Sequence, residues 1–163
     1  MVGFRRILMS VAIISVLALA TAVAPCSAQT VVPANDCRIV AGRCLQQQAA
    51  LHPEWSWAGA ELGPEQTFTD LSGTPAVHVF PVATAGRDVG YITISAVRDR
   101  GPFIECGTGL SPLAALRNTG GASARLIYTR GDEYYSQAAD GSLRGLLSGV
   151  SSSTRDVAWA TSI

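Results

Sequence analysis

The sequence predicts an α+β domain with two layers, in which an N-terminal helix packs on a curved antiparallel β-sheet. Two patterns lead to this prediction. Residues 35–51 place apolar side chains at helical spacing, and from Trp55 onward short β-rich runs alternate with turn residues. Behind an N-terminal leader, residues 29–163 are enough for one hydrophobic core, so we expect a single domain.

The helix is predicted over residues 35–51. Asn35 or Asp36 is expected to cap its start, and His52-Pro53 ends it because proline disfavours helical geometry in the preceding residue. One stripe along this helix carries the side chains expected to face the sheet: Cys37, Val40, Ala41, Cys44, Gln48 and Leu51. The helix is therefore amphipathic and is expected to cover one face of the sheet.

Strands are predicted where β-rich residues run between turn residues. The expected strands cover residues 67–71, 76–82, 89–96, 103–106, 124–129 and 133–137, with Ser72-Gly73 as the first turn and a hairpin loop over 84–88. A short helix capped by Ser111-Pro112 runs to Arg117. One helix over such a curved meander is the arrangement of a cystatin-like two-layer domain, which we place at residues 29–147.

Two glycine-containing tripeptides are interpreted as turns. Gly107-Thr108-Gly109 lacks the third glycine and the long following helix of a phosphate-binding loop. Arg130-Gly131-Asp132 spells an adhesion motif, but between two predicted strands it fits a hairpin turn in which glycine supplies a positive φ. The tail over residues 148–163 has little periodicity, and we expect it to be poorly ordered apart from docking of Trp159.

Residues 1–28 have the three regions of a secretory signal peptide. Two arginines precede a long apolar run, and small residues precede Gln29. No stop-transfer pattern follows the apolar run, which favours cleavage after Ala28 over a membrane anchor. Lipid attachment to Cys26 is a third alternative, although Pro25 stands where a lipoprotein signal has a small residue. We expect a secreted or periplasmic protein with no membrane contact after cleavage.

Charge argues against two classes of partner. The chain has 12 Lys and Arg and 12 Asp and Glu, and loss of Arg5 and Arg6 with the leader leaves a formal net charge of about −2. Nucleic acids and anionic membranes are bound by concentrated basic surfaces. We therefore expect neither of them as a partner.

No set of residues in the sequence indicates catalysis, a metal or a cofactor. His52 and His78 are the two histidines, and neither Cys-x-x-Cys nor His-x-x-x-His spacing occurs. A base and nucleophile pair of His78 and Cys106 would need both side chains within hydrogen-bond reach. Since the sequence offers neither of them an orienting partner, we interpret both as structural residues. We predict a protein that is not an enzyme.

The cysteines predict one disulfide and one free thiol. After cleavage three remain, Cys37, Cys44 and Cys106, in a compartment where cysteines usually pair. Cys37 and Cys44 are two helical turns apart, roughly 10 Å along the axis, which is too far for a bond between them. We therefore expect Cys106 to bond with either Cys37 or Cys44.

Trp55 and Trp57 are the candidate partner-contact residues. Paired aromatic side chains can anchor a protein interface, or they can fill the end of a core between helix and sheet. We interpret at least one of the two as buried.

Several segments, taken in order, resemble a known module. They are the helix end Leu51-His52-Pro53-Glu54-Trp55, Ala58-Gly59-Ala60, Val79-Phe80-Pro81-Val82, residues 89–96 (VGYITISA), Ile104-Glu105-Cys106-Gly107, Leu110-Ser111-Pro112-Leu113, Leu126-Ile127-Tyr128 and Glu133-Tyr134-Tyr135. Over residues 36–147 the chain resembles the propeptide-like and inhibitor domains of streptopain-type secreted cysteine peptidases, with a wider likeness to PepSY-type domains. A full precursor of that kind continues into a catalytic domain, so we expect this chain to be the regulatory part without the enzyme.

The resemblance implies a secreted non-catalytic domain that acts as a stand-alone inhibitor or folding partner of a secreted cysteine peptidase. Such a domain can cover the active-site cleft with a loop or add an edge strand to its partner. The alternative is a secreted or envelope ligand-binding module, or a remnant, with no peptidase partner.

We predict that the exported protein begins at Gln29. Intact-mass spectrometry of protein collected outside the cytoplasm checks this, because loss of residues 1–28 lowers the mass by a fixed amount. A retained Met1, or a lipid adduct on Cys26, would contradict the prediction.

Overall fold

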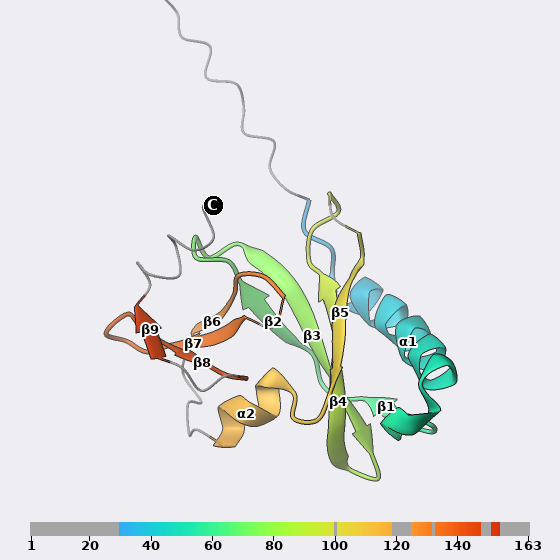
Figure 1. Ribbon diagram of the computed structural model, residues 1–163. Helices are drawn as coiled ribbons and strands as arrows, with labels where there is room; N and C mark the ends of the chain where they lie inside the picture. The colour runs from blue at the N-terminus through green and yellow to red at the C-terminus, as the bar shows by residue number, and fades with distance from the viewer. Residues whose placement is uncertain (1–29, 100, 119–124, 132, 148–150, 154–163) are drawn as a thin grey trace, which may run out of the picture.

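The computed structural model describes residues 30–99, 101–118, 125–131, 133–147 and 151–153. It confirms the α+β class, with one long helix packed on a mostly antiparallel sheet (Figure 1). The elements are α1 (Ala34–Leu51), a 3₁₀ turn (Pro53–Trp55), β1 (Glu61–Leu62), β2 (Gln66–Thr69), β3 (Pro75–Thr84), β4 (Arg87–Ser95), β5 (Phe103–Thr108), α2 (Pro112–Asn118), β6 (Arg125–Tyr128), β7 (Tyr134–Gln137), β8 (Ser142–Gly145) and β9 (Ser151–Ser153).

The sheet has one parallel pair of strands, which the sequence did not predict. Its strand order is β5-β4-β3-β2-β6-β7-β8-β9, and β1 pairs with β3 next to β2. Every neighbouring pair is antiparallel except β2 and β6, which pair in parallel where Thr69 lies beside Ile127. Parallel neighbours need a crossover connection, and the segment containing β3 to β5 and α2 lies between these two strands in the chain.

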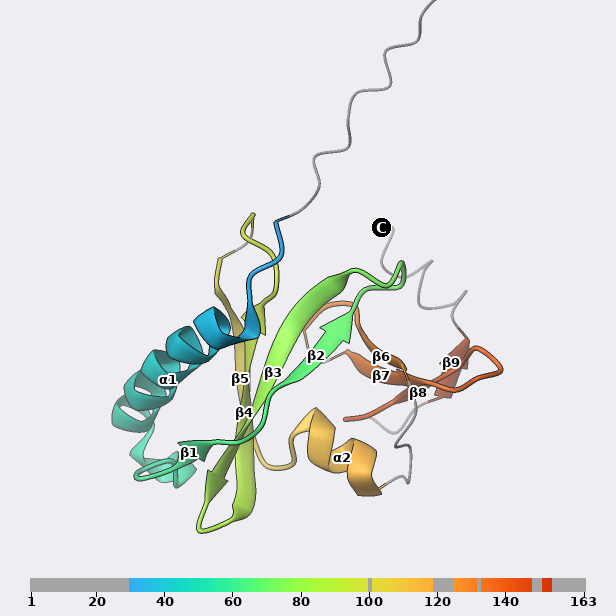
Figure 2. The same ribbon diagram turned by 180° about the vertical axis from the view of Figure 1, so that it is seen from behind.

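The sheet curls away from α1. Seen from the front and from behind, α1 lies on one side of β3 to β5, whereas α2 and strands β6 to β9 lie on the other (Figures 1 and 2). The Tyr134 hydroxyl of β7 lies 2.6 Å from the Thr93 hydroxyl of β4. These two strands are far apart in the strand order, so this hydrogen bond requires strong curvature.

Helix α1 starts and packs differently from the prediction. Pro33, rather than Asn35 or Asp36, is its N-cap, and the Pro33 carbonyl accepts bonds from the Asp36 and Cys37 amides at 3.1 and 3.2 Å. The helix ends before His52-Pro53 as expected.

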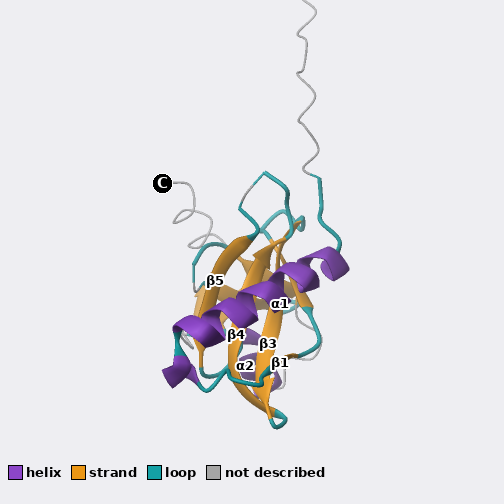
Figure 3. Cartoon of the chain, turned by 90° about the vertical axis from the view of Figure 1, so that its right-hand side faces the viewer, coloured by secondary structure: helices purple, strands orange, loops and turns teal. Residues whose placement is uncertain are grey.

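The stripe that faces the sheet also differs at its C-terminal end. Cys37 and Ala41 are buried, Leu45 is buried as well, and Leu51 is 62% exposed instead of packed. Figure 3 shows α1 crossing the strands obliquely, so one straight stripe does not remain over the sheet along the whole helix.

The β3–β4 hairpin is longer and its turn tighter than predicted. Thr84 and Arg87 pair with each other, so the expected loop over 84–88 shrinks to Ala85-Gly86. Both turn residues have positive φ, 49° and 75°. This is the pattern of a two-residue type I′ turn, whose twist matches that of the two strands.

The expected turn at residues 107–109 begins later than predicted. Gly107 and Thr108 belong to β5 and pair with Tyr91 and Gly90, and the chain leaves the strand at Gly109 with φ 93°. Ser111 caps α2, since its hydroxyl accepts the Ala114 amide at 3.1 Å.

The C-terminal strands agree with the prediction in part. β6 and β7 form the expected antiparallel hairpin, and Gly131 in its turn has φ 48°, whereas Asp132 lies outside the described residues. β1, β8 and β9 were not predicted. β9 falls within residues 148–163, and Trp159 lies outside the described residues.

Two glycines let aromatic rings pack closely on both faces of the paired strands β4 and β5. A Cβ at Gly90 would lie 2.6 Å from Trp57 on the α1 side and 2.4 Å from the Gly107 carbonyl oxygen. A Cβ at Gly107 would lie 2.7 Å from the Tyr91 ring, which packs on the opposite side. Each ring therefore occupies the space that a side chain would fill.

We expect Gly90→Ala to lower the free energy of unfolding by about 1–3 kcal/mol, because the added methyl overlaps Trp57 and backbone. Gly42→Ala in α1 is the matched control. Apart from its chain neighbours and the backbone of α1 itself, no atom lies within 4 Å of its added Cβ, so helix propensity alone should raise stability by about 0.5–1 kcal/mol. Urea unfolding followed by circular dichroism measures both, and equal effects of the two substitutions would contradict this packing.

Candidate functional site

The structure separates the two tryptophans. Trp57 is 1% exposed and donates from Nε1 to the Val89 carbonyl at 3.3 Å, so it belongs to the core and cannot serve as a surface anchor. Trp55 is half-buried, stacks on His52 with centroids 4.1 Å apart, and meets Trp57 edge-on. Of the candidate partner contacts, Trp55 alone reaches the surface.

His78 is a structural residue with both ring nitrogens engaged. Nδ1 lies 2.6 Å from Glu65 Oε1, and Nε2 lies 3.1 Å from the Val32 carbonyl oxygen. Thr67 donates to the same Glu65 oxygen at 2.6 Å. An oxygen atom therefore lies within hydrogen-bond distance of each ring nitrogen, which fixes the orientation of the ring. Through Val32, this buried cluster ties the segment before α1 to the sheet.

His78 and Cys106 do not meet. His78 lies on β3 opposite Ile94, Cys106 lies on β5 opposite Ile92, and β4 runs between these two strands. The structure therefore does not assemble the base and nucleophile pair that the sequence left open.

The expected disulfide is absent. Cys37, Cys44 and Cys106 are free thiols, and Cys26 lies outside the described residues. Cys37 is directed to β4, where its Sγ–H donates to the Ser95 carbonyl at 3.6 Å, so it does not face Cys106 on β5.

Burial keeps the three thiols protonated. Cys44 and Cys106 border the same apolar cluster under α1. Burial raises the pKa of all three thiols, and the neighbouring Cys44 raises the pKa of Cys106 further. A thiol with a raised pKa is a weak nucleophile at neutral pH.

Arg38 joins α1 to the edge strand β1. Its guanidinium donates to the Leu62 carbonyl at 2.7 Å and to the Gly63 carbonyl at 2.9 Å, and it lies 5.9 Å from the Phe80 ring centroid. These bonds close one wall of a groove of about 610 Å³ between α1 and β1. Leu45 also lines the groove.

A second cavity, of about 450 Å³, lies at the start of α1. Its lining is mainly apolar and includes Cys37, Ile94, Val97 and Pro102, with Arg98 among its polar residues. In the described part of the chain, no group of His, Cys, Asp and Glu side chains is arranged to hold a metal ion. Neither cavity therefore offers a metal centre within these residues.

Tyr134 is the centre of a buried polar contact inside the curled sheet. Its hydroxyl donates to the Glu105 carboxylate and lies 2.6 Å from the Thr93 hydroxyl. Burial raises the pKa of Tyr134, and the hydrogen bond to Glu105 raises it further. The Phe68 and Tyr91 rings pack edge-on against it at centroid distances of 5.3 and 5.9 Å.

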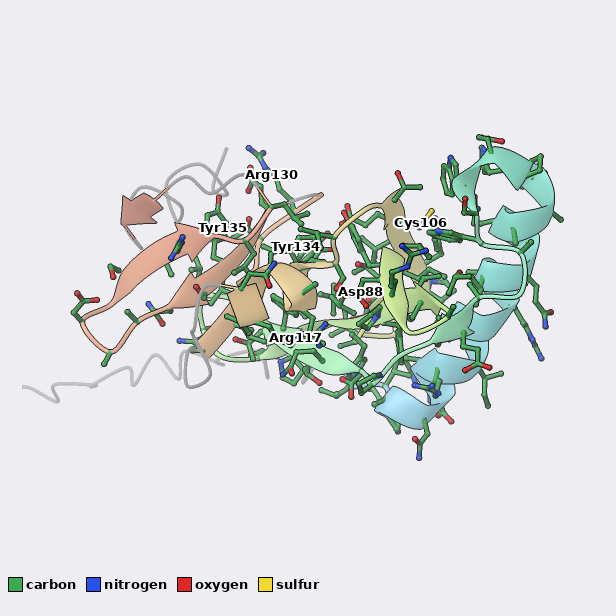
Figure 4. All side chains as sticks on the ribbon, turned by 90° about the horizontal axis from the view of Figure 1, so that it is seen from below. Asp88, Cys106, Arg117, Arg130, Tyr134 and Tyr135 are labelled. Atoms are coloured by element: carbon green, nitrogen blue, oxygen red, sulfur yellow. The ribbon has the colours of Figure 1, made fainter. Side chains whose placement is uncertain are left out.

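Asp88 holds α2 next to this contact. Its Oδ2 accepts the Ser111 hydroxyl at 3.2 Å and an Arg117 Nη2–H at 3.1 Å. Seen from below, Tyr134 lies with α2 and the β6–β8 strands, whereas Cys106 lies toward α1 (Figure 4). The polar contact around Tyr134 and the thiol of Cys106 therefore lie on opposite sides of the sheet.

Sequence reasoning did not single out Arg38, Glu65 or Tyr134. Arg38 lies outside the predicted apolar stripe of the helix, and no sequence pattern shows that it reaches β1. Tyr134 was included in the resemblance as part of Glu133-Tyr134-Tyr135, without a role. Its partners are 29 and 41 residues away in the chain, so spacing gave no signal.

No family model, curated protein or solved structure matches this chain. Among the described residues, no helix combines the length and apolar character needed to cross a membrane.

We predict that Tyr134 makes stability depend on alkaline pH. Its pKa is raised in the folded state, whereas the unfolded chain ionises near the usual tyrosine value of about 10. The contribution is complete below about pH 10 and is lost as pH rises through and above that value. The free energy of unfolding of the wild type should therefore fall more steeply above pH 9 or so than that of Tyr134→Phe.

At neutral pH, Tyr134→Phe should also be less stable by about 1–3 kcal/mol, because Glu105 and Thr93 lose their partner. Denaturant unfolding across a pH series measures both effects. The other three of the four tyrosines are common to both proteins, so they cancel in the comparison. Identical pH slopes would show that Tyr134 ionises in the folded protein as it does in the unfolded chain.

Proposed function

We propose that this protein is a secreted non-catalytic domain that binds a cysteine peptidase and acts as its inhibitor or folding partner. The observation that carries the proposal is the position of the segments that resemble streptopain-type propeptides. Residues 79–82, 89–96 and 104–107 lie largely on the neighbouring strands β3, β4 and β5. The resemblance therefore follows one packed unit of the structure.

The side chains inside that unit explain why such a resemblance extends over several segments. Trp57, just before Ala58-Gly59-Ala60, packs on Gly90 of residues 89–96. Tyr91 of the same segment packs on Gly107 of residues 104–107. The three segments are therefore packed against one another. Leu110-Ser111-Pro112-Leu113 then starts α2, which Asp88 holds in place. These are packing residues, as expected for a domain that acts through its folded surface.

The chemistry of the described residues also supports binding without turnover. The thiols have raised pKa values, and the ring nitrogens of His78 are engaged by Glu65 and Val32. With a net charge of about −2, apolar and backbone contacts would supply most of the affinity, so salt should affect it weakly.

The test uses the mature protein, residues 29–163, and a purified streptopain-type peptidase as the probe. We expect a stable complex, slower hydrolysis of a peptide substrate, and an intact domain after incubation. Affinity should change less than about threefold between low and moderate salt. Inhibition kinetics and calorimetry measure these quantities, with heat-unfolded domain as the control.

Trp55→Ala tests the exposed aromatic residue in the same assay. We expect it to weaken binding by about tenfold, because Trp55 is the member of the pair that reaches the surface. If the wild type neither binds nor inhibits the peptidase, the proposed function is wrong. The two cavities beside α1 would then favour the alternative of a ligand-binding module.

A further inference from the structure

We infer that the outer edge of β5 is the docking site, and that the peptidase adds an extended segment to it as a further strand. This inference rests on the proposed function and specifies how the partner is bound. β5 is the first strand in the sheet order, so in the described part of the chain no strand lies beyond it.

The register of β4 and β5 shows which backbone groups face outward. The Gly109 amide donates to the Val89 carbonyl at 3.0 Å, just beyond the strand ends. In an antiparallel pair, residues alternate between bonding to the neighbouring strand and facing away from it. In this register Gly107 and Glu105 therefore bond inward to β4.

The residues between them present the free edge. The N–H and C=O groups of Cys106 and Thr108 face away from β4, and in the described part of the chain no neighbouring strand pairs with them. Such an edge is complemented by another extended polypeptide, the mode known as β-augmentation. Exposed apolar side chains stand near both ends of the strand, with Phe103 40% exposed and Leu110 56% exposed.

Among the described residues, a side chain protects the edge at β1, whereas none covers the outward-facing backbone groups of β5. At β1 the Arg38 guanidinium occupies the carbonyl of Leu62, the outward-facing residue whose acceptor a new strand would need, and also binds the Gly63 carbonyl. A charged side chain placed over a strand edge is a common protection against unwanted pairing. On β5 the charged residue is Glu105, and Tyr134 binds its carboxylate on the inner side of the curled sheet.

The chemistry of the β5 edge also defines the segment that it takes. Cys106 and Thr108 are uncharged, and the apolar contacts lie at Phe103 and Leu110. The occupant is therefore an uncharged, extended stretch of the peptidase with apolar side chains that reach these two residues. Its main chain supplies the affinity, and its side chains supply the specificity.

Thr108→Pro tests the edge directly in the mature protein. Proline removes the outward N–H of residue 108 and leaves the inward bonds of β5 in place, because edge strands tolerate proline where the N–H faces solvent. Thr108→Val is the matched control, since it keeps the N–H and the β-branched shape and replaces only the hydroxyl with a methyl group. With the same streptopain-type peptidase as the probe, we expect the valine variant to bind like the wild type and the proline variant to bind at least about tenfold more weakly.

Amide hydrogen exchange of the wild type tests the inference without a substitution. We expect the Cys106 and Thr108 amides to exchange quickly in the free protein and slowly in the complex. If a complex forms but these amides stay unprotected and Thr108→Pro binds normally, the edge assignment is wrong and the proposed function stands. If the wild type forms no complex, both are wrong.

Discussion

The packing of Trp57 on Gly90 and of Tyr91 on Gly107 is the contact on which the layers of this domain depend. A ring approaches the paired strands β4 and β5 from each face, and the absent Cβ atoms give both rings room. Trp57 brings the chain after α1 down onto the sheet, and Tyr91 begins the core on the other face, where Phe68 and Tyr134 continue it. These two contacts on β4 and β5 therefore position both the helix on one face and the curled strands on the other.

Hydrogen bonds and ion pairs fix the relative positions of elements, which non-directional apolar packing alone does not determine. Tyr134 links β7 to β4 and β5, and Asp88 links α2 to β4. On the α1 side, His78 with Glu65 fastens the entering chain, and Arg38 fastens β1. Each of these contacts joins segments distant in sequence, and none of them covers the outward-facing backbone groups of Cys106 and Thr108 on β5, the edge strand of the described sheet.

Local rules predicted the fold where local physics decides it. The helix end at His52-Pro53, the cap at Ser111 and the β6–β7 hairpin all depend on residues within a few positions of one another. The parallel pairing of Thr69 with Ile127 and the bond from Tyr134 to Glu105 depend on how distant segments meet, and neither leaves a spacing pattern. The proposed docking edge is similar, because which backbone groups of β5 stay unpaired depends on the sheet order and not on its own residues.

The parallel pairing of β2 with β6 also affects the order in which this chain is expected to fold. The Thr69 hydroxyl donates to the Leu126 carbonyl, 57 residues further along the chain, whereas β3 and β4 meet across Ala85-Gly86. A two-residue hairpin can close within about 1–10 μs. Pairing β2 with β6 closes a much longer loop, and the entropic cost of closing it is larger. The strands β3 to β5 can therefore pair early, and β6 to β8 dock afterwards, when Tyr134 reaches a sheet that already exists.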